Sequence, residues 1–386
     1  MRAVILAAGE GGRLRPLTTY MPKVMLPVGN KPILEFIIKA LMENDIRDIT
    51  LVVGYHQDKI KQYFGSGSEF GARIDYAVQK KQLGTAHALY HARMDDEFLL
   101  FYGDNLVTSE CVKELLKSEV NTILGSYSDR PWKYGVIEKK SNKLVKIKEK
   151  LRESEEAIVF TGMGHFDGKI FELIEERMRE GIYDLPDILN EMEIKIKVIS
   201  GWRDAIYPWD LLELNSYALK DTTRKLAGKI EDSTIIGDVE IGENTKIGAG
   251  SYIRGKVKIG KNCEIGPNSV ILGDTSIGDG VRIGAMSYIE NSIIMSNTNI
   301  GINALIKDSV IGRNVDIAPK FVALSGKIKR IVDDEVIEVT GGAVIGDGAS
   351  LGPVVIVHPG VLIGSNSNIG ALKLIDKDVA NGERVI

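Results

Sequence analysis

Residues 241–289 read IGENTKIGAGSYIRGKVKIGKNCEIGPNSVILGDTSIGDGVRIGAMSYI, with an isoleucine at every sixth position. After one five-residue step the series continues through Ile294 and Ile300, and as aliphatic residues it returns between Ile345 and Ile375. A period of six fits neither an α-helix nor a heptad repeat. It indicates a triangular coil of short parallel strands, in which every sixth side chain points inward and glycine occupies tight corners.

This pattern resembles the left-handed hexapeptide β-helix. We expect residues 229–386 to form such a domain, with an insertion near 319–343, where the period breaks. The insertion could be a plain connection, or a loop that reaches a neighbouring subunit or covers a ligand. The resemblance also implies a homo-oligomer, most simply a trimer through the β-helix.

Composition changes near residue 229. The first 229 of the 386 residues hold 18 of the 41 glycines, and the remainder holds 23, whereas the aromatic residues divide 22 to 3 in the other direction. The net charge of -4 argues against a nucleic-acid binder. No apolar run is long enough to span a membrane, and no secretory signal is evident, so we expect a cytoplasmic protein.

Residues 1–228 carry the alternating pattern of an α/β domain. The apolar runs 2–8, 49–53 and 98–102 suit buried parallel strands, and 31–44 shows helical periodicity. The pattern predicts a Rossmann-like sheet, whose ligands bind beyond the carboxyl ends of the strands. Asp104 and the loop after the first strand lie at such ends.

That loop contains Gly9, Gly11, Gly12 and Arg13. Glycines let backbone N–H groups approach phosphate oxygens, and the guanidinium adds positive charge. The loop is not a Rossmann fingerprint, because Pro16 interrupts the helix that should follow, and it lacks the GK[ST] of a Walker A motif. His87 and His91 lie four residues apart, a spacing more typical of histidines on one helix face than of a metal pair.

Three segments together resemble the sugar-1-phosphate nucleotidylyltransferases. These are LAAGEGGRLRPLT at 6–18, PKVMLPV at 22–28 and QKKQLGTAHA at 79–88. The last segment is especially similar to the bifunctional N-acetylglucosamine-1-phosphate uridylyltransferase and glucosamine-1-phosphate acetyltransferase family, including its archaeal type. The order of the two halves is the same, so the resemblance covers essentially the whole chain.

The resemblance implies a role for each matching residue. Arg13 and Lys23 would neutralise phosphate charge in catalysis, and Asp104 with Asp204 would bind Mg²⁺; Asp210 is the alternative to Asp204. The other implied contacts are with the nucleotide (Ala7, Ala8, Gly9, Gly11, Gly12, Gln79, Gly84 and Thr85) and with the sugar (Gly135, Glu149 and Thr161).

The implied reaction transfers a nucleotidyl group, most simply from UTP, to a hexose or N-acetylhexosamine 1-phosphate and releases pyrophosphate. The sugar phosphate is already ionised, so positioning and charge neutralisation suffice and no nucleophilic side chain is required. Three alternatives remain: a thymidylyltransferase or guanylyltransferase specificity, an additional acetyltransferase in the β-helix, and a non-catalytic subunit that senses nucleotide sugars.

The sequence departs from the family in both halves. Gly12 stands in place of Thr or Ser, Val24 in place of Pro, and Phe160 in place of an Asn that contacts ligand. In the β-helix, Ile302 aligns with the acetyltransferase base histidine and Leu305 with a tyrosine, and neither side chain can accept a proton. His358, the only histidine of the β-helix, is expected to be a corner residue.

Overall fold

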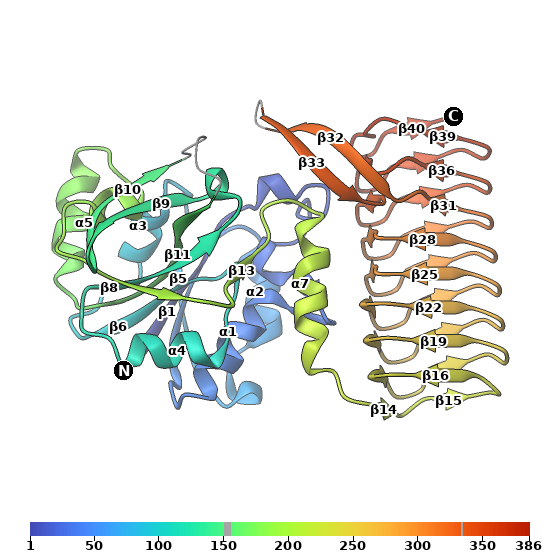
Figure 1. Cartoon of the computed structure of the whole chain (residues 1–386), viewed down its shortest axis with the longest axis horizontal. Coiled ribbons are helices and arrows are strands. Elements are labelled where there is room, and N and C mark those ends of the chain that lie inside the picture. Colours follow the sequence, from blue (N-terminus) through green and yellow to red (C-terminus); the bar gives the residue numbers. More distant parts are fainter. Residues whose placement is uncertain (150–155, 333–334) are drawn as a thin grey trace. The chain divides into compact units, whose positions relative to one another are not determined.

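The computed structural model describes residues 1–149, 156–332 and 335–386, and these residues form two compact units (Figure 1). The first unit comprises Met1–Glu10, Met21–Met25 and Pro32–Asp204. The second comprises Gly11–Tyr20, Leu26–Lys31 and Ala205–Ile386. Two short N-terminal segments on either side of Lys23 therefore belong to the unit that contains the β-helix.

The first unit is built on a nine-stranded sheet. Its parallel centre consists of the first strands of the chain, and β11 is antiparallel to all three strands with which it pairs, β6, β8 and β9. The strands in spatial order are β5 (Arg73–Val78), β4 (Asp48–Val53), β1 (Arg2–Ala7), β6 (Phe98–Tyr102), β11 (Ala157–Phe166), β8 (Thr122–Ser128), β12 (Lys195–Ile199), β10 (Lys143–Glu149) and β9 (Gly135–Lys140).

Helices cover both faces of this sheet, because alternate side chains of its central strands enter different hydrophobic clusters. Ile5 of β1 packs with one cluster and Val4 with the other. The cluster that contains Ile5 includes residues of α1 (Ile33–Met42), α2 (Gln57–Phe64) and α4 (Ser109–Leu116); the cluster that contains Val4 includes residues of α3 (Thr85–Tyr90), α5 (Ile170–Arg179) and α6 (Leu185–Leu189).

Among the described residues no helix is long and apolar enough to cross a membrane.

The second unit contains the predicted left-handed β-helix, whose strands form three parallel sheets. The first sheet consists of β14 (Lys225–Leu226), β17 (Val239–Ile241), β20 (Val257–Ile259), β23 (Thr275–Ile277), β26 (Ile293–Ile294), β29 (Val310–Ile311), β34 (Val344–Ile345) and β37 (Leu362–Ile363). The second consists of β15 (Lys229–Ile230), β18 (Lys246–Ile247), β21 (Glu264–Ile265), β24 (Arg282–Ile283), β27 (Asn299–Ile300), β30 (Asp316–Ile317), β35 (Ser350–Leu351), β38 (Asn368–Ile369) and β40 (Arg384–Val385). The third consists of β16 (Thr234–Ile236), β19 (Tyr252–Arg254), β22 (Val270–Leu272), β25 (Tyr288–Glu290), β28 (Leu305–Lys307), β31 (Val322–Ala323), β36 (Ile356–Val357) and β39 (Leu374–Ile375).

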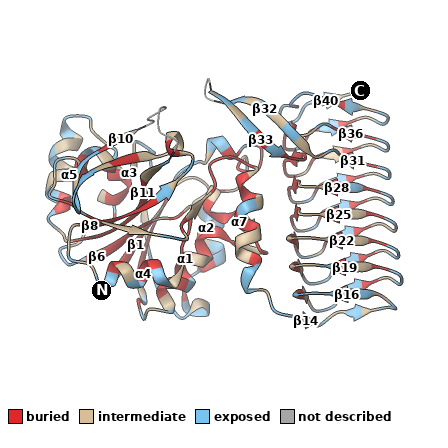
Figure 2. Cartoon of the chain, viewed as in Figure 1, coloured by how far each residue is buried: buried red, intermediate tan, exposed pale blue. Residues whose placement is uncertain are grey.

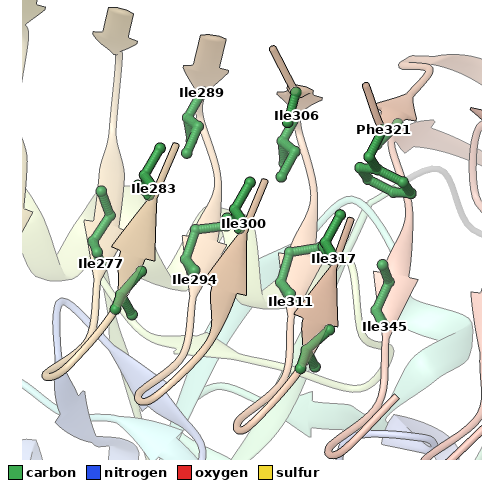
Figure 3. Packing of buried hydrophobic residues seen from close by; sticks show 14 of the residues in the cluster. Ile277, Ile283, Ile289, Ile294, Ile300, Ile306, Ile311, Ile317, Phe321 and Ile345 are labelled. Carbon is green, nitrogen blue, oxygen red and sulfur yellow. The ribbon is translucent and has the colours of Figure 1, made fainter. Parts of the chain in front are cut away.

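The isoleucines predicted to point inward do so, and those of successive coils stack on one another (Figure 3). In the first sheet Ile277 pairs with Ile294, and Ile294 with Ile311. In the second sheet β18, β21, β24 and β27 each pair an exposed residue with a buried one, whereas β23, β26, β29 and β34 of the first sheet are buried along their whole length. Figure 2 colours the chain by burial. The five-residue step shortens the coil: Cys263 bonds Thr245 across 18 positions, whereas Ala304 bonds Ser287 across 17.

The coil corners differ from the expectation that glycine would fill them. Asparagine adopts positive φ at many corners, among them Asn268 and Asn303. Its short polar side chain tolerates this left-handed conformation better than most residues do. Asparagine therefore shares the corner positions with glycine.

The expected insertion contains a β-hairpin, formed by β32 (Gly326–Val332) and β33 (Glu335–Gly341). Strand β31 also lies within 319–343 but belongs to a coil. Helix α7 (Asp210–Ala218) completes the second unit, and its buried Asn215 donates a hydrogen bond to Asp274 O.

Candidate active site

The ammonium group of Lys23 lies between two carboxylates of the first unit. Its Nζ is 2.7 Å from Asp104 Oδ2 and 3.0 Å from Asp204 Oδ1. The side chains of Lys23 and Asp204 are largely buried, and Asp104 is more accessible. Residues that are far apart in the sequence thus form one charged cluster.

Local structure explains why these three residues meet. Lys23 begins the short 3-10 helix η2 (Lys23–Met25), and Asp104 follows the central strand β6. Asp204 ends the two-residue strand β13 (Arg203–Asp204), which pairs with β7 (Asn105–Leu106) and places Asp204 opposite Asn105. Asp104 therefore lies at the carboxyl end of a parallel strand, where ligands of such sheets bind.

The charges of this cluster balance in a way that keeps Lys23 ionised. Burial lowers the pKa of Lys23, but the carboxylates of Asp104 and Asp204 outweigh that effect and hold the pKa above its ordinary value. The two carboxylates already share one cation, and their oxygens are the hard ligands that Mg²⁺ prefers. Among the described residues no group of three or more side chains could hold a metal ion. A pair of carboxylates fits Mg²⁺, which often takes its other ligands from water and substrate phosphates.

Gln79 and Gly84 come together in the predicted nucleotide-binding segment. The Gln79 side chain is buried, and its Nε2 donates a hydrogen bond to Gly84 O at 3.1 Å. A Cβ at Gly84 would lie 2.4 Å from Tyr183 O, so only glycine fits there. Thr85 begins α3; its N–H donates to Asp184, and its hydroxyl accepts from Leu185 N–H.

The end of β1 leads towards the glycine-rich loop. Ala7 and Ala8 are buried, and Ala8 O accepts a hydrogen bond from Tyr55 N–H. At Gly9 an added Cβ would meet no protein atom within 4 Å. The backbone at Gly9 is therefore open to close approach.

The three residues assigned to the sugar are held differently. Gly135 pairs with Glu149 across β9 and β10, although the Glu149 side chain lies outside the described residues. Thr161 is buried, and its hydroxyl donates to Leu124 O. Phe160 packs edge to face on Tyr102, with ring centroids 5.8 Å apart.

Gly11, Gly12 and Arg13 belong to the second unit. Gly11 has a left-handed conformation and precedes the 3-10 helix η1 (Gly12–Leu14), which carries the exposed Arg13. Thr18 Oγ1 donates to Gly11 O at 2.8 Å and closes the segment on itself. This is a compact turn, not the helix that a Rossmann fingerprint requires.

Side-chain contacts of the same segment lie at the far end of the β-helix. Ser365 Oγ donates to Pro16 O at 3.1 Å, and Asn366 Nδ2 donates to the Tyr20 hydroxyl at 3.0 Å. Sequence reasoning did not find these partners, because nothing in a repeat distinguishes one coil end from another.

Asp210 has a structural role. It is buried at the start of α7, and its Oδ2 accepts hydrogen bonds from the N–H groups of Ile206 and Tyr207.

Asn105 was not predicted as a site residue; its buried amide donates to Thr161 O at 2.6 Å and so supports the strand beside Asp104. A two-residue strand leaves no periodic signal in the sequence.

Residues 2–219 match the nucleotidyl transferase family, so the chain belongs to that family. Residues 252–327 match a second model, the GMPPB C-terminal domain. Nucleotidyl transferases of this family use a divalent metal ion and act on nucleotide and sugar phosphate substrates.

Relatives of known name indicate which kind of nucleotidyl transferase this chain is similar to. The chain is 37% identical to the bifunctional protein GlmU of Methanococcus maripaludis, over 98% of this chain and 95% of the relative. It is 33% identical to the bifunctional sugar-1-phosphate nucleotidylyltransferase/acetyltransferase of Sulfurisphaera tokodaii, over 99% of both chains. A crystal structure described as a glucose-1-phosphate thymidylyltransferase of Bacillus anthracis is 29% identical; it matches 58% of this chain and 98% of its own with a TM-score of 0.53. The predicted membership among the sugar-1-phosphate nucleotidylyltransferases is thereby confirmed.

Proposed function

We propose that this enzyme transfers a uridylyl group from UTP to a hexose or N-acetylhexosamine 1-phosphate, with Mg²⁺ as its metal ion. The observation that carries the proposal is the Lys23 ammonium held between Asp104 and Asp204. Such a cluster supplies a fixed positive charge next to two metal-ligating carboxylates.

In the proposed reaction an ionised oxygen of the sugar phosphate attacks the α-phosphorus of the nucleotide. A new P–O bond forms, the bond between the α-phosphorus and the bridging oxygen breaks, and pyrophosphate leaves with the electron pair. Lys23 and Arg13 stabilise the charge on the phosphate oxygens by fixed electrostatic contacts. Mg²⁺, held by Asp104 and Asp204, would supply further charge neutralisation when bound.

The remaining assignments follow the same proposal. Ala7, Ala8, Gly9, Gln79, Gly84 and Thr85 contact the base and ribose, and Gly11 and Gly12 contact phosphates through their backbone. Gly135, Glu149 and Thr161 contact the sugar. A nucleoside triphosphate substrate also supports a cytoplasmic location.

The test measures pyrophosphate release. The purified protein is incubated with Mg²⁺, with each of UTP, dTTP and GTP, and with hexose and N-acetylhexosamine 1-phosphates. We expect turnover with UTP and its loss on chelation of the metal. Turnover with GTP alone would contradict the choice of base, and no turnover with any pair would contradict the proposed activity.

We propose in addition that the β-helix assembles the chain into a trimer. In the second sheet the outward side chains are polar or charged, as at Glu264 and Arg282. In the third sheet the outward residue after the buried position is charged in several coils, at Arg254, Glu290 and Lys307, but the outward residue before it is apolar in coil after coil. We call the apolar set the apolar stripe; it consists of Tyr252, Val270, Tyr288, Leu305, Val322, Ile356 and Leu374. Leu305 is 41% and Leu374 60% exposed, and a second copy would cover such a surface.

Light scattering coupled to gel filtration tests the assembly. Leu305→Asp with Leu374→Asp should give monomers, because charge would be buried in the interface. The control Asn299→Asp with Asn368→Asp, on the second sheet, should leave the trimer unchanged. A wild-type monomer, or a trimer that survives the apolar-stripe variant, would contradict this proposal.

Acetyl transfer is the second candidate function, because the two relatives above are named bifunctional. The structure places Ile302 on an exposed corner and Leu305 on an outward position, and neither can act as a base. His358 follows β36 and is exposed. We therefore propose a structural β-helix; release of free CoA from acetyl-CoA and glucosamine 1-phosphate would overturn that view.

A further inference from the structure

His87 contacts the side chain assigned to the base, although the assignments made so far give it no role. It lies on α3, and its Nδ1 is 2.9 Å from Gln79 Nε2. Its ring packs edge to face against His91, with centroids 4.8 Å apart, and lies 6.1 Å from the ring of Tyr183. The histidine is therefore held by ring packing while it contacts Gln79.

The hydrogen bonds fix which way the Gln79 amide points. Gly84 O can only accept, so the group 3.1 Å from it must be the donor Nε2. The same nitrogen faces His87 Nδ1, which must then accept and carry no proton. His87 is consequently neutral, with its proton on Nε2.

The surroundings of His87 favour that neutral form. Burial lowers the pKa of His87, and the neighbouring His91 lowers it further. The carbonyl oxygen of Tyr183, in the loop before α6, accepts a hydrogen bond from the backbone N–H of His87 and so fixes the main chain at this residue. The carboxylate of the next residue, Asp184, accepts a hydrogen bond from the backbone N–H of Thr85.

We propose that His87 is a positioning residue that sets the choice of pyrimidine. With both Nε2 contacts satisfied, Gln79 Oε1 points away from them, and no described residue donates a hydrogen bond to it. An oxygen in that position accepts the N3–H of uracil or thymine, whereas cytosine has an unprotonated acceptor at N3. The inference rests on the proposed function of Gln79 in base binding.

Protonation of His87 reverses the arrangement. A proton on Nδ1 would face the Nε2 donor of Gln79, and turning the amide would bring its oxygen towards Gly84 O. Either arrangement loses a hydrogen bond, so discrimination between UTP and CTP should weaken as the pH falls through the lowered pKa of His87.

The experiment compares kcat/KM for UTP and CTP from about pH 8 down to about pH 4.5, a window that extends well below the ordinary histidine pKa. His87→Phe keeps the ring packing but removes the acceptor, and the ratio of UTP to CTP should fall about tenfold, the order expected for one hydrogen bond. His87→Asn places an oxygen near the position of Nδ1, so the ratio should stay high and lose its pH dependence. The matched control His91→Phe should retain the ratio at pH 8, and the pH at which the ratio falls should move upwards, because His91 no longer lowers the pKa of His87.

An unchanged ratio in His87→Phe, or a pH profile of wild type that His87→Asn reproduces, would overturn the inference. If His87→Phe fails to fold, the comparison of wild type with His87→Asn decides alone. A wild-type protein that turns over neither UTP nor dTTP would instead contradict the proposed function, so the two failures are distinguishable.

Discussion

Lys23 combines two demands that usually conflict, burial and full charge. Transfer of an ammonium group out of water is costly unless opposite charges surround it, and here Asp104 and Asp204 do so. The pair of carboxylates in turn needs the cation, because two like charges held close together repel each other. Each member of the cluster therefore stabilises the others before any substrate binds.

Removal of the cation should affect activity far more than a comparable change at the surface. Lys23→Met should lower kcat for pyrophosphate release by about 10²–10³, the loss typical of one preorganised electrostatic contact. Lys39→Met is the control, since Lys39 is exposed and forms an i,i+4 pair with Glu43. Equal activity of the two variants would contradict the role of Lys23.

The pH dependence of this residue has a definite sign. Because the pKa of Lys23 is raised, its ion pairs contribute to stability fully below the ordinary value near 10.5 and are lost only as the pH rises through the folded value. We expect no loss of kcat/KM from Lys23 between about pH 7 and 10. A basic limb with a midpoint near pH 8–9 that moves in Lys23→Arg would show otherwise.

The sequence predicted individual site residues better than their supports. Lys23 and Asp104 follow from a motif and from the end of an apolar strand, and the structure brings them into contact. Asn105 could not be predicted, because its role depends on the ladder between two strands of two residues each. Interactions that arise only when distant segments pair leave no trace in local periodicity.

At the scale of elements, each coil of the β-helix buries its isoleucines against the coils above and below. Ile265→Ala should lower the free energy of unfolding, measured in denaturant, by about 2–5 kcal/mol, because it opens a cavity in a core where that side chain is 1% exposed. The adjacent Glu264→Ala changes an outward side chain and should cost less than about 0.5 kcal/mol. Similar losses for both variants would argue against the stacked core.

The period of six made this architecture readable in advance, since backbone geometry and side-chain burial repeat together. The hairpin of β32 and β33 was not predicted as such, because alternation within an insertion does not reveal whether its strands pair with each other or with a coil. The asparagine corners were also missed, for the six-residue pattern fixes the buried positions more strongly than the turn residues.

At the scale of the whole molecule, the segment that carries Arg13 is bonded to the terminal coils of the β-helix. Ser365→Ala with Asn366→Ala removes the hydrogen bonds to Pro16 O and to the Tyr20 hydroxyl. We expect kcat to fall several-fold, because the segment that carries Arg13 is then held less firmly. The melting temperature should change little, because the two hydrogen bonds contribute only about 1 kcal/mol each. Asn368→Ala, an outward position on β38, is the control, and its kcat should be that of wild type.

The repeating coil of the β-helix determines where the second half of the chain can change in length. Residues one coil apart are 18 positions apart in the early coils and 17 in the middle coils, and Ile311 still pairs with Ile345 although the β32–β33 hairpin lies between them. The buried column therefore stays in phase when a whole coil is added, or when the change of length falls at a corner. Evolution or design can therefore lengthen this part in steps of one coil while the buried column stays in phase. A change of one residue within a strand would instead exchange the inward and outward side chains of that strand.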